Sequence, residues 1–329
     1  MHFAPIVLVV GVLVSLAASQ LTGSTILQIL NTTQLSPAYE FLRLLNSSSE
    51  YRPVMDLLNQ TGNITVFAPS DKFYKQFQKQ SQGGGQTSSG QGGSSDNQTS
   101  NATSTGPPSP FPTWLLTQNF TVADLIKYHI VNSSFLLNDL TNQTVVNSTL
   151  SNNQTTSKFP YGLPLLIQSN VTDPSNSSNA GFWVGNGRRA ANVVLSDIVA
   201  SNGVLHIIDN ILLPPQAPTE VIKNVSSLSE LAKAIQRYPE LGARLNSTSN
   251  TMERLVRAHF LEGVYYTTNF TEAAGGNGTI TVTTAANTSL PITVNGTRIR
   301  VNNTINVVES NILMNNGVLH VIDQAFQPQ

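Results

Sequence analysis

The stretch NGVLHIIDNILLPP, from Asn202 to Pro215, returns at the end of the chain as NGVLHVIDQAFQPQ, from Asn316 to Gln329. Both copies place a histidine inside an apolar run, at His206 and His320. A phrase that recurs at this distance indicates a duplicated structural unit. The chain is therefore predicted to contain two related repeats, each of which closes on this strand-like segment.

A second pair of segments falls into register once the closing segments are aligned. TVADLIKYHIV, from Thr121 to Val131, corresponds to TMERLVRAHFL, from Thr251 to Leu261. Apolar residues recur at helical spacing in both, and the first opens with a capping-box pattern. Each segment is predicted to be an amphipathic helix that places its histidine, His129 or His259, on the face toward the core.

Strand signals lie between the helix and the closing segment of each repeat. TITVTT, PITVNGTRIRV and INVVE alternate apolar and polar residues in the second repeat. Asn295-Gly296 is predicted to form a two-residue hairpin turn there, and Asn186-Gly187 the equivalent turn of the first repeat. Helices followed by strands indicate an α+β fold with a mostly antiparallel sheet.

The overall composition bounds the size and the class of the protein. Its 329 residues suit two domains, charged residues make up 11% of the chain, and the formal net charge is -1. A nucleic-acid-binding protein would show a basic surplus, which is absent here, so we expect no nucleic-acid partner. The chain has no cysteine, so its domains must be stable without disulfides.

The first residues have the pattern of a secretory signal peptide. An apolar run from Pro5 to Ala18 ends in small residues, with Ala17 and Ser19 fitting a cleavage site before Gln20. At about 14 residues the run is too short to cross the hydrocarbon core of a bilayer. We therefore expect residues 1–19 to be removed and the mature protein to be secreted, with no transmembrane segment after cleavage.

N-x-[ST] triplets are unusually dense. About twenty are spread over both repeats, which favours a heavily glycosylated extracellular protein. The predicted glycosylation sites are Asn31, Asn46, Asn59, Asn63, Asn97, Asn101, Asn119, Asn132, Asn142, Asn147, Asn153, Asn170, Asn176, Asn224, Asn246, Asn269, Asn277, Asn287 and Asn302. Asn295 also heads such a triplet, but its place in a tight turn makes it a poor acceptor.

The chain divides into two predicted domains. The first covers residues 22–215 and contains a Gly-, Ser-, Gln- and Asn-rich insertion at 78–113, which has too little apolar surface to fold. Pro214, Pro215 and Pro218 mark the boundary, because proline interrupts strands. The second domain covers residues 216–329.

Three features of the first repeat resemble the fasciclin domain family. ITVFAPSDKFY, from Ile64 to Tyr74, is similar to the first signature box of the family, Tyr128-His129 to its Tyr-His pair, and SDIVASNGVLHIIDNILLPP, from Ser196 to Pro215, to its second box. The resemblance implies a β-wedge sheet packed with helices, in two tandem copies. It also implies a role in cell adhesion, or in an extracellular matrix or cell wall, with cell-surface or matrix proteins, glycans or further copies of the chain as partners.

The second repeat departs from the family pattern. No segment like TVFAPSD precedes its Thr251 helix, and Ala258 stands where the first repeat has Tyr128. The second domain is therefore predicted to be shortened and to lack one edge of its wedge.

The resemblance also implies candidate adhesion residues. In some animal relatives, the Tyr-His pair and an Asp-Ile pair just before the second box are linked to integrin binding. The matching residues are Tyr128, His129, Asp197 and Ile198 in the first repeat, with Asn311 and Ile312 in the second.

The histidines of the repeats are the first residues to test for chemistry. They lie in no H-x-H or HExxH pattern, and no serine stands in a nucleophile elbow. We therefore predict no metal, no cofactor and no catalytic residue, and interpret His206, His259 and His320 as structural core residues. Asp209 and Asp323 are expected to form hydrogen bonds at the strand ends.

Two other functions remain open. A carbohydrate- or wall-binding structural protein would need exposed aromatic side chains, for which Trp114, Phe182, Trp183, Tyr265 and Tyr266 are available. A wall-polymer hydrolase would need two facing carboxylates, and the sequence identifies no such pair.

Overall fold

The structure is a computed structural model that describes residues 23–32, 37–75, 120–140, 143–151, 159–169, 181–228 and 251–325. The predicted signal peptide at 1–19 and the predicted insertion at 78–113 lie outside these residues. The chain divides into two compact units, of which unit 1 holds Met1–Leu136 and Val193–Ile211, and unit 2 holds Leu137–Asn192 and Leu212–Gln329. Each unit is described by itself.

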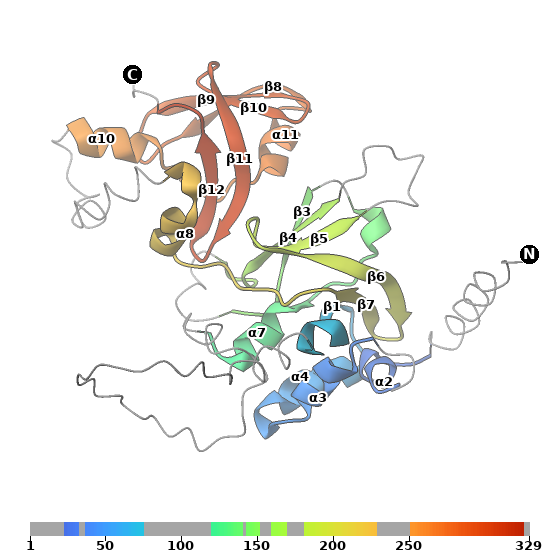
Figure 1. The fold of residues 1–329 in the computed structure, drawn as a ribbon. Coiled ribbons are helices and arrows are strands. Elements are labelled where there is room, and N and C mark those ends of the chain that lie inside the picture. Colours follow the sequence, from blue (N-terminus) through green and yellow to red (C-terminus); the bar gives the residue numbers. More distant parts are fainter. Residues whose placement is uncertain are drawn as a thin grey trace, which may run out of the picture. The chain divides into compact units, whose positions relative to one another are not determined.

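The first described helices of unit 1 (Figure 1) are α2 (Ile26–Leu30), α3 (Tyr39–Leu45) and α4 (Arg52–Asn59), with a short 3-10 turn, η1 (Ser49–Tyr51), before α4. Helix α2 begins with a capping box, in which the side chains of Thr25 and Gln28 each accept a hydrogen bond from the backbone N–H of the other. The three helices contact one another and contribute Ile26, Phe41 and Leu58 to the core.

Strand β1 (Ile64–Pro69) lies at the centre of the packing in unit 1. It pairs antiparallel with β2 (Ile130–Val131) and parallel with β7 (Gly203–Ile208). All six of its residues are buried, as expected for the apolar run ITVFAP in a parallel strand covered on both faces. Before β2 comes helix α7 (Val122–Tyr128), which starts with the predicted capping box of Thr121 and Asp124.

The first sheet has seven strands in the order β2-β1-β7-β6-β5-β4-β3. All neighbours except β1 and β7 are antiparallel, which confirms the predicted mostly antiparallel α+β fold. The remaining strands are β3 (Gln143–Asn147), β4 (Pro164–Ser169), β5 (Phe182–Gly185) and β6 (Ala190–Ala200), and a 3-10 turn, η2 (Leu137–Asp139), precedes β3.

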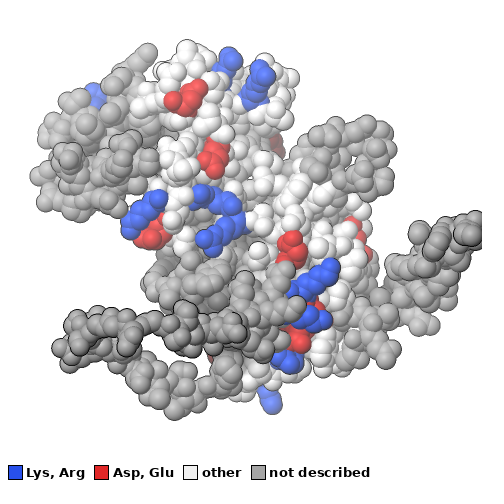
Figure 2. All heavy atoms as spheres, viewed as in Figure 1, with Lys and Arg blue, Asp and Glu red and all other residues white. Residues whose placement is uncertain are grey.

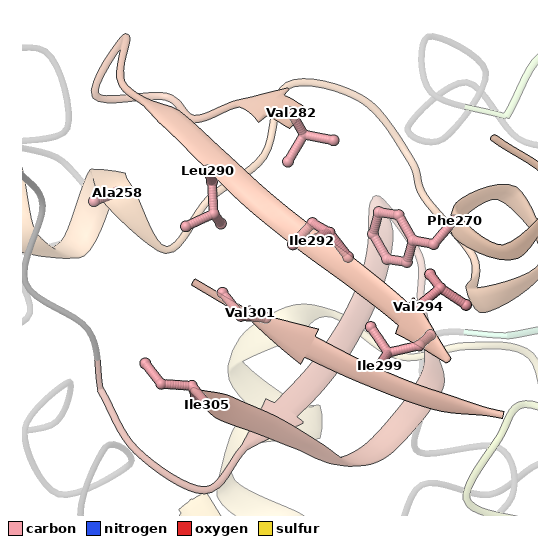
Figure 3. Packing of buried hydrophobic residues seen from close by; sticks show 9 residues of the cluster. All are labelled: Ala258, Phe270, Val282, Leu290, Ile292, Val294, Ile299, Val301 and Ile305. Atoms are coloured by element: carbon pink, nitrogen blue, oxygen red, sulfur yellow. The ribbon is translucent and has the colours of Figure 1, made fainter. Parts of the chain in front are cut away.

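The second sheet, in unit 2, has five antiparallel strands in the order β12-β11-β10-β9-β8. Its core forms where alternate residues of β9 and β10 meet Phe270, as Figure 3 shows. The elements of this repeat are α8 (Pro218–Asn224), η4 (Ser226–Leu228), α10 (Thr251–Ala258), α11 (Thr267–Ala273), β8 (Asn277–Thr283), β9 (Ser289–Asn295), β10 (Arg298–Val301), β11 (Ile305–Met314) and β12 (Gly317–Ile322).

The two sheets match strand for strand from the closing strand outward. β12, β11, β10, β9 and β8 follow the order of β7, β6, β5, β4 and β3. Among the described residues, the second sheet has no counterpart of β1 or β2. This agrees with the prediction that the second repeat is shortened and lacks one edge of its wedge.

The predicted equivalence of the two Asn-Gly turns is wrong. Asn295-Gly296 joins β9 to β10, whereas Asn186-Gly187 joins β5 to β6. In the second sheet, the counterpart of the β5–β6 turn is the β10–β11 turn, in which Asn302 and Asn303 have positive φ angles of 50° and 66°. Asn-Gly favours any turn that needs positive φ, so the dipeptide predicts a turn without saying which strands it connects.

Candidate adhesion site

Four of the candidate adhesion residues, Asp197 with Ile198 and Asn311 with Ile312, lie at corresponding β-bulges of the two sheets. Pairing slips between Leu195 and Ile198 in β6, and between Glu309 and Ile312 in β11. At both bulges the residue before the isoleucine is left-handed, with φ of 61° at Asp197 and 55° at Asn311. Asp and Asn tolerate this conformation better than other residues with a side chain.

A histidine on the closing strand supports each bulge from the neighbouring position. The Asp197 N–H donates to His206 Nδ1 at 3.0 Å, and the Asn311 N–H donates to His320 Nδ1 at 3.4 Å. Nδ1 is therefore the acceptor, so the ring is neutral with its proton on Nε2. In the second repeat, that Nε2–H donates to the Tyr265 carbonyl at 2.8 Å.

Burial keeps both rings neutral. It lowers the pKa of His206 to about 4, against the weaker opposing influence of the Phe135 carbonyl. The His206 ring is stacked on Phe67, with ring centroids 5.2 Å apart. Burial likewise lowers the pKa of His320, and the Tyr265 carbonyl opposes it. A buried, neutral ring whose Nδ1 accepts from the backbone of the bulge serves as a structural brace rather than as a proton-transfer group. His206 Nδ1 also lies 3.8 Å from Asp197 Oδ1.

Comparison with known proteins agrees with this duplicated architecture. A family model, the fasciclin domain, matches residues 99–214 and 231–328. The chain belongs to the fasciclin domain family. A solved FAS1 domain pair from the insect cell adhesion molecule fasciclin I is 16% identical, covers 88% of this chain and 96% of its own, and has a TM-score of 0.36. No curated protein matches the chain.

The Tyr-His pair of the first fasciclin domain lies in its interior. Tyr128 is 0% exposed and His129 1% exposed, and the His129 ring lies 6.3 Å from that of Phe41. His129 Nδ1–H donates to the Leu125 carbonyl at 2.6 Å. Burial lowers the pKa of His129 to about 4, with the Leu125 carbonyl opposing it. A partner can reach neither side chain in this fold, so the pair can support adhesion only by holding the neighbouring backbone in place.

The second fasciclin domain keeps only part of this arrangement. Ala258, in the position of Tyr128, is buried, whereas His259 is only partly buried. Asn311 and Ile312, the second candidate pair, are both completely buried. Of the three histidines predicted to be structural core residues, His206 is fully buried, whereas His259 and His320 are only partly buried.

The first bulge is the more accessible of the two. Asp197 and Ile198 are partly buried, and three apolar side chains beside them are exposed: Val194 at 52%, Leu195 at 49% and Val199 at 47%. Sequence analysis missed these three residues. The sequence does contain a signal for them. A strand that packs on a core with one face alternates apolar and polar residues, whereas NVVLSDIVA has apolar residues on both faces.

The second bulge is covered by its own surroundings within unit 2. The Asn311 side chain accepts from the Thr267 N–H at 3.0 Å and donates to Gln143 Oε1 at 2.8 Å. Two residues further on, the Leu313 N–H donates to the Asn186 carbonyl at 3.0 Å. The asparagine therefore organises the packing of unit 2, and its side chain is not available to a partner.

The other predicted chemistry can be placed as well. Within the described residues, no group of three His, Asp or Glu side chains could hold a metal ion. Asp323 accepts from the Asn306 N–H at 2.9 Å and from the Asn306 side chain at 2.7 Å, which confirms its predicted hydrogen bond at the end of a strand. These donors lower the pKa of the Asp323 carboxyl.

Of the aromatic residues considered for carbohydrate binding, Trp183, Tyr265 and Tyr266 are partly buried. Phe182 is buried, Tyr265 stacks on Phe270 with ring centroids 5.6 Å apart, and burial raises the pKa of Tyr266 to about 12. Trp114 lies outside the described residues.

None of the described helices is long and apolar enough to span a membrane. On the face shown in Figure 2, acidic and basic side chains are interspersed and most of the described surface is uncharged.

The neutral histidines predict a loss of stability in mild acid. His129 and His206 have pKa values of about 4 in the fold, below the ordinary 6.5 that the unfolded chain shows. The unfolded chain therefore takes up protons that the fold does not, and stability falls as the pH drops from 6.5 toward 4. Each histidine contributes a slope of about 1.4 kcal/mol per pH unit.

Urea denaturation at several pH values between 7.5 and 5 measures this slope. The His129→Gln variant has one titrating ring fewer and should show a shallower fall than the parent protein. Equal slopes in the two proteins would contradict the assignment.

Proposed function

We propose that this chain is a secreted, N-glycosylated protein that acts in cell adhesion or in contacts within an extracellular matrix or cell wall, without catalysis. Membership of the fasciclin domain family, which is known in cell adhesion proteins, supports the adhesive part. The buried, neutral histidines support the non-catalytic part, because proton-transfer groups work near their pKa and in contact with substrate.

One observation carries the extracellular part of the proposal. The predicted glycosylation asparagines that fall within the described residues lie at the surface. Asn302 is partly buried, and the exposed ones are Asn31, Asn46, Asn59, Asn63, Asn132, Asn147, Asn224, Asn269, Asn277 and Asn287. Buried asparagines could not carry glycans in a folded protein, so this distribution fits glycosylation along the secretory route.

The contact surface would be the exposed strip around the first bulge, formed by Val194, Leu195 and Val199 beside Asp197. None of the predicted glycosylation sites lies on this part of β6. Weak contacts through such a strip gain strength when many copies face one another on two surfaces.

The matched experiment compares the exposed valines of β6 with an exposed valine of β11 in adhesion. Purified secreted chain on beads should promote bead aggregation or binding to cells, and Val194→Ser with Val199→Ser should reduce binding about tenfold. Val308→Ser is the control, because Val308 is 59% exposed and lies on β11, the corresponding strand of the second repeat. Beads that stay dispersed and ignore cells would reject the adhesive role.

Secretion and glycosylation are tested on the same preparation. Expressed in a eukaryotic host, the chain should enter the medium and lose apparent mass when its N-glycans are removed enzymatically. Retention inside the cell, or an unchanged mass, would contradict this part of the proposal.

A further inference from the structure

The two closing strands have almost the same sequence but different neighbours. β7 pairs with β6 on one side and with β1 on the other, from Ile64 opposite Gly203 to Pro69 opposite Ile208. β12 pairs with β11 and is the last strand of its sheet in the described part of the chain. Among the described residues, therefore, no strand pairs with β12 in the way that β1 pairs with β7.

The glycines at the start of β7 and β12 have different surroundings. Pairing with β1 requires a glycine at the start of β7. A Cβ on Gly203 would lie 1.9 Å from the Ile64 carbonyl oxygen, so only glycine allows β1 to approach so closely. At Gly317, the nearest atom to such a Cβ is Met314 Cε at 3.9 Å. The second repeat therefore carries the same glycine, but no described residue approaches it closely enough to require it.

The preceding asparagine shows the same contrast. Asn202 is 1% exposed, accepts from the Ile26 N–H at 2.9 Å and donates to the Leu58 and Gln60 carbonyls at 2.8 and 3.0 Å. Its own carbonyl accepts from the first residue of β1 at 3.3 Å. Asn316, in the same position before β12, is exposed.

The partly buried side chains of β12 and its lack of charge also suit an edge strand that pairs with another segment. Val204, Leu205 and His206 on β7 are at most 5% exposed, whereas the corresponding residues 318–320 on β12 are only partly buried. Residues 316–322 contain neither a charge nor a proline, which are the features that protect exposed edge strands from pairing with other chains.

Helix α8 packs beside β12. Val221 of α8 and Val225, which caps the end of that helix, pack against Ile312 and Val321. Helix α2, which likewise opens the first repeat, contacts β7 while β1 still pairs along that strand. A helix in this position is therefore compatible with a strand at the edge.

We propose that the outer edge of β12, from Asn316 to Ile322, is a strand-accepting site that binds an extended, uncharged apolar segment of a partner protein in parallel register. Backbone hydrogen bonds supply the attraction, and apolar side chains of the segment cover the partly buried residues of β12. The close approach at Gly317 requires that residue to lack a side chain. The inference goes beyond the proposed adhesive role, because strand binding can be measured whether or not the chain mediates adhesion.

A peptide copied from β1 tests the site directly. A fluorescent NITVFAPS peptide, with the sequence of Asn63–Ser70, is titrated into the full chain and its anisotropy recorded. Gly317→Val should weaken binding by about tenfold or more. The fold should tolerate this change, because the position is open and Gly317 does not have a positive φ.

Two controls separate strand pairing from general stickiness. Thr281→Val changes an exposed residue of β8, the opposite edge strand, and should leave binding unchanged. A peptide with proline in place of Thr65 and Phe67 cannot pair and should not bind. Equal binding to the parent and Gly317→Val proteins would overturn the proposal, and so would self-association of the chain through β12 with no binding of the peptide.

Discussion

Asn202→Ala should lower the free energy of unfolding by roughly 3 kcal/mol, the largest effect that we expect from a single polar side chain in this protein. The Asn202 side chain satisfies the Ile26 N–H at the start of α2 and the carbonyls of Leu58 and Gln60 at the end of α4. Alanine would leave these groups in place without partners, and unpaired buried polar groups are costly.

Asn316→Ala is the matched control for this substitution. It makes the same change in the same NGVLH phrase, but at an exposed position, so it should alter stability by less than about 0.5 kcal/mol. Urea denaturation of the full chain measures both variants. Similar losses in the two would show that the asparagine acts locally, through its own turn, and not by joining α2 to α4.

Gly187→Ala should cost about 3 kcal/mol and loosen the packing of unit 2 around the second bulge. Gly187 has a φ of 85°, and an added Cβ would lie 2.2 Å from the Asn311 carbonyl oxygen. The turn would have to move away from β11, which would break the hydrogen bond from the Leu313 N–H to the Asn186 carbonyl. Hydrogen exchange at the Leu313 amide should therefore accelerate.

Gly296→Ala separates this contact from ordinary turn strain. Gly296 is also the glycine of an Asn-Gly turn, with a φ of 58°, but no atom lies within 4 Å of the added Cβ. Only the left-handed conformation opposes the change, at about 1 kcal/mol. Exchange at Leu313 should stay slow in this variant, and equal acceleration in both would reject the contact at Gly187.

The repeat could be predicted from the sequence because turns, bulges and helix caps each require particular residues. NGVLH recurs because both closing strands begin at a turn and carry a histidine that braces a bulge. The capping pattern at Thr121 predicted the start of α7, since this signal depends on neighbours along the chain, and the ITVFAP run was part of the resemblance to the family. The shortened second repeat followed from the absence of a similar run.

The partners of each side chain needed the tertiary structure. Asn202 and Asn316 stand in identical phrases, yet one is buried and the other exposed, because α4 and β1 pack only against the first. Likewise, the two Asn-Gly turns have the same local preference, but only Gly187 meets another strand. Local sequence determined the strands, helices and turns of this protein through backbone conformation. The tertiary structure alone decided which copies of a residue are enclosed, because burial depends on segments far away in the chain.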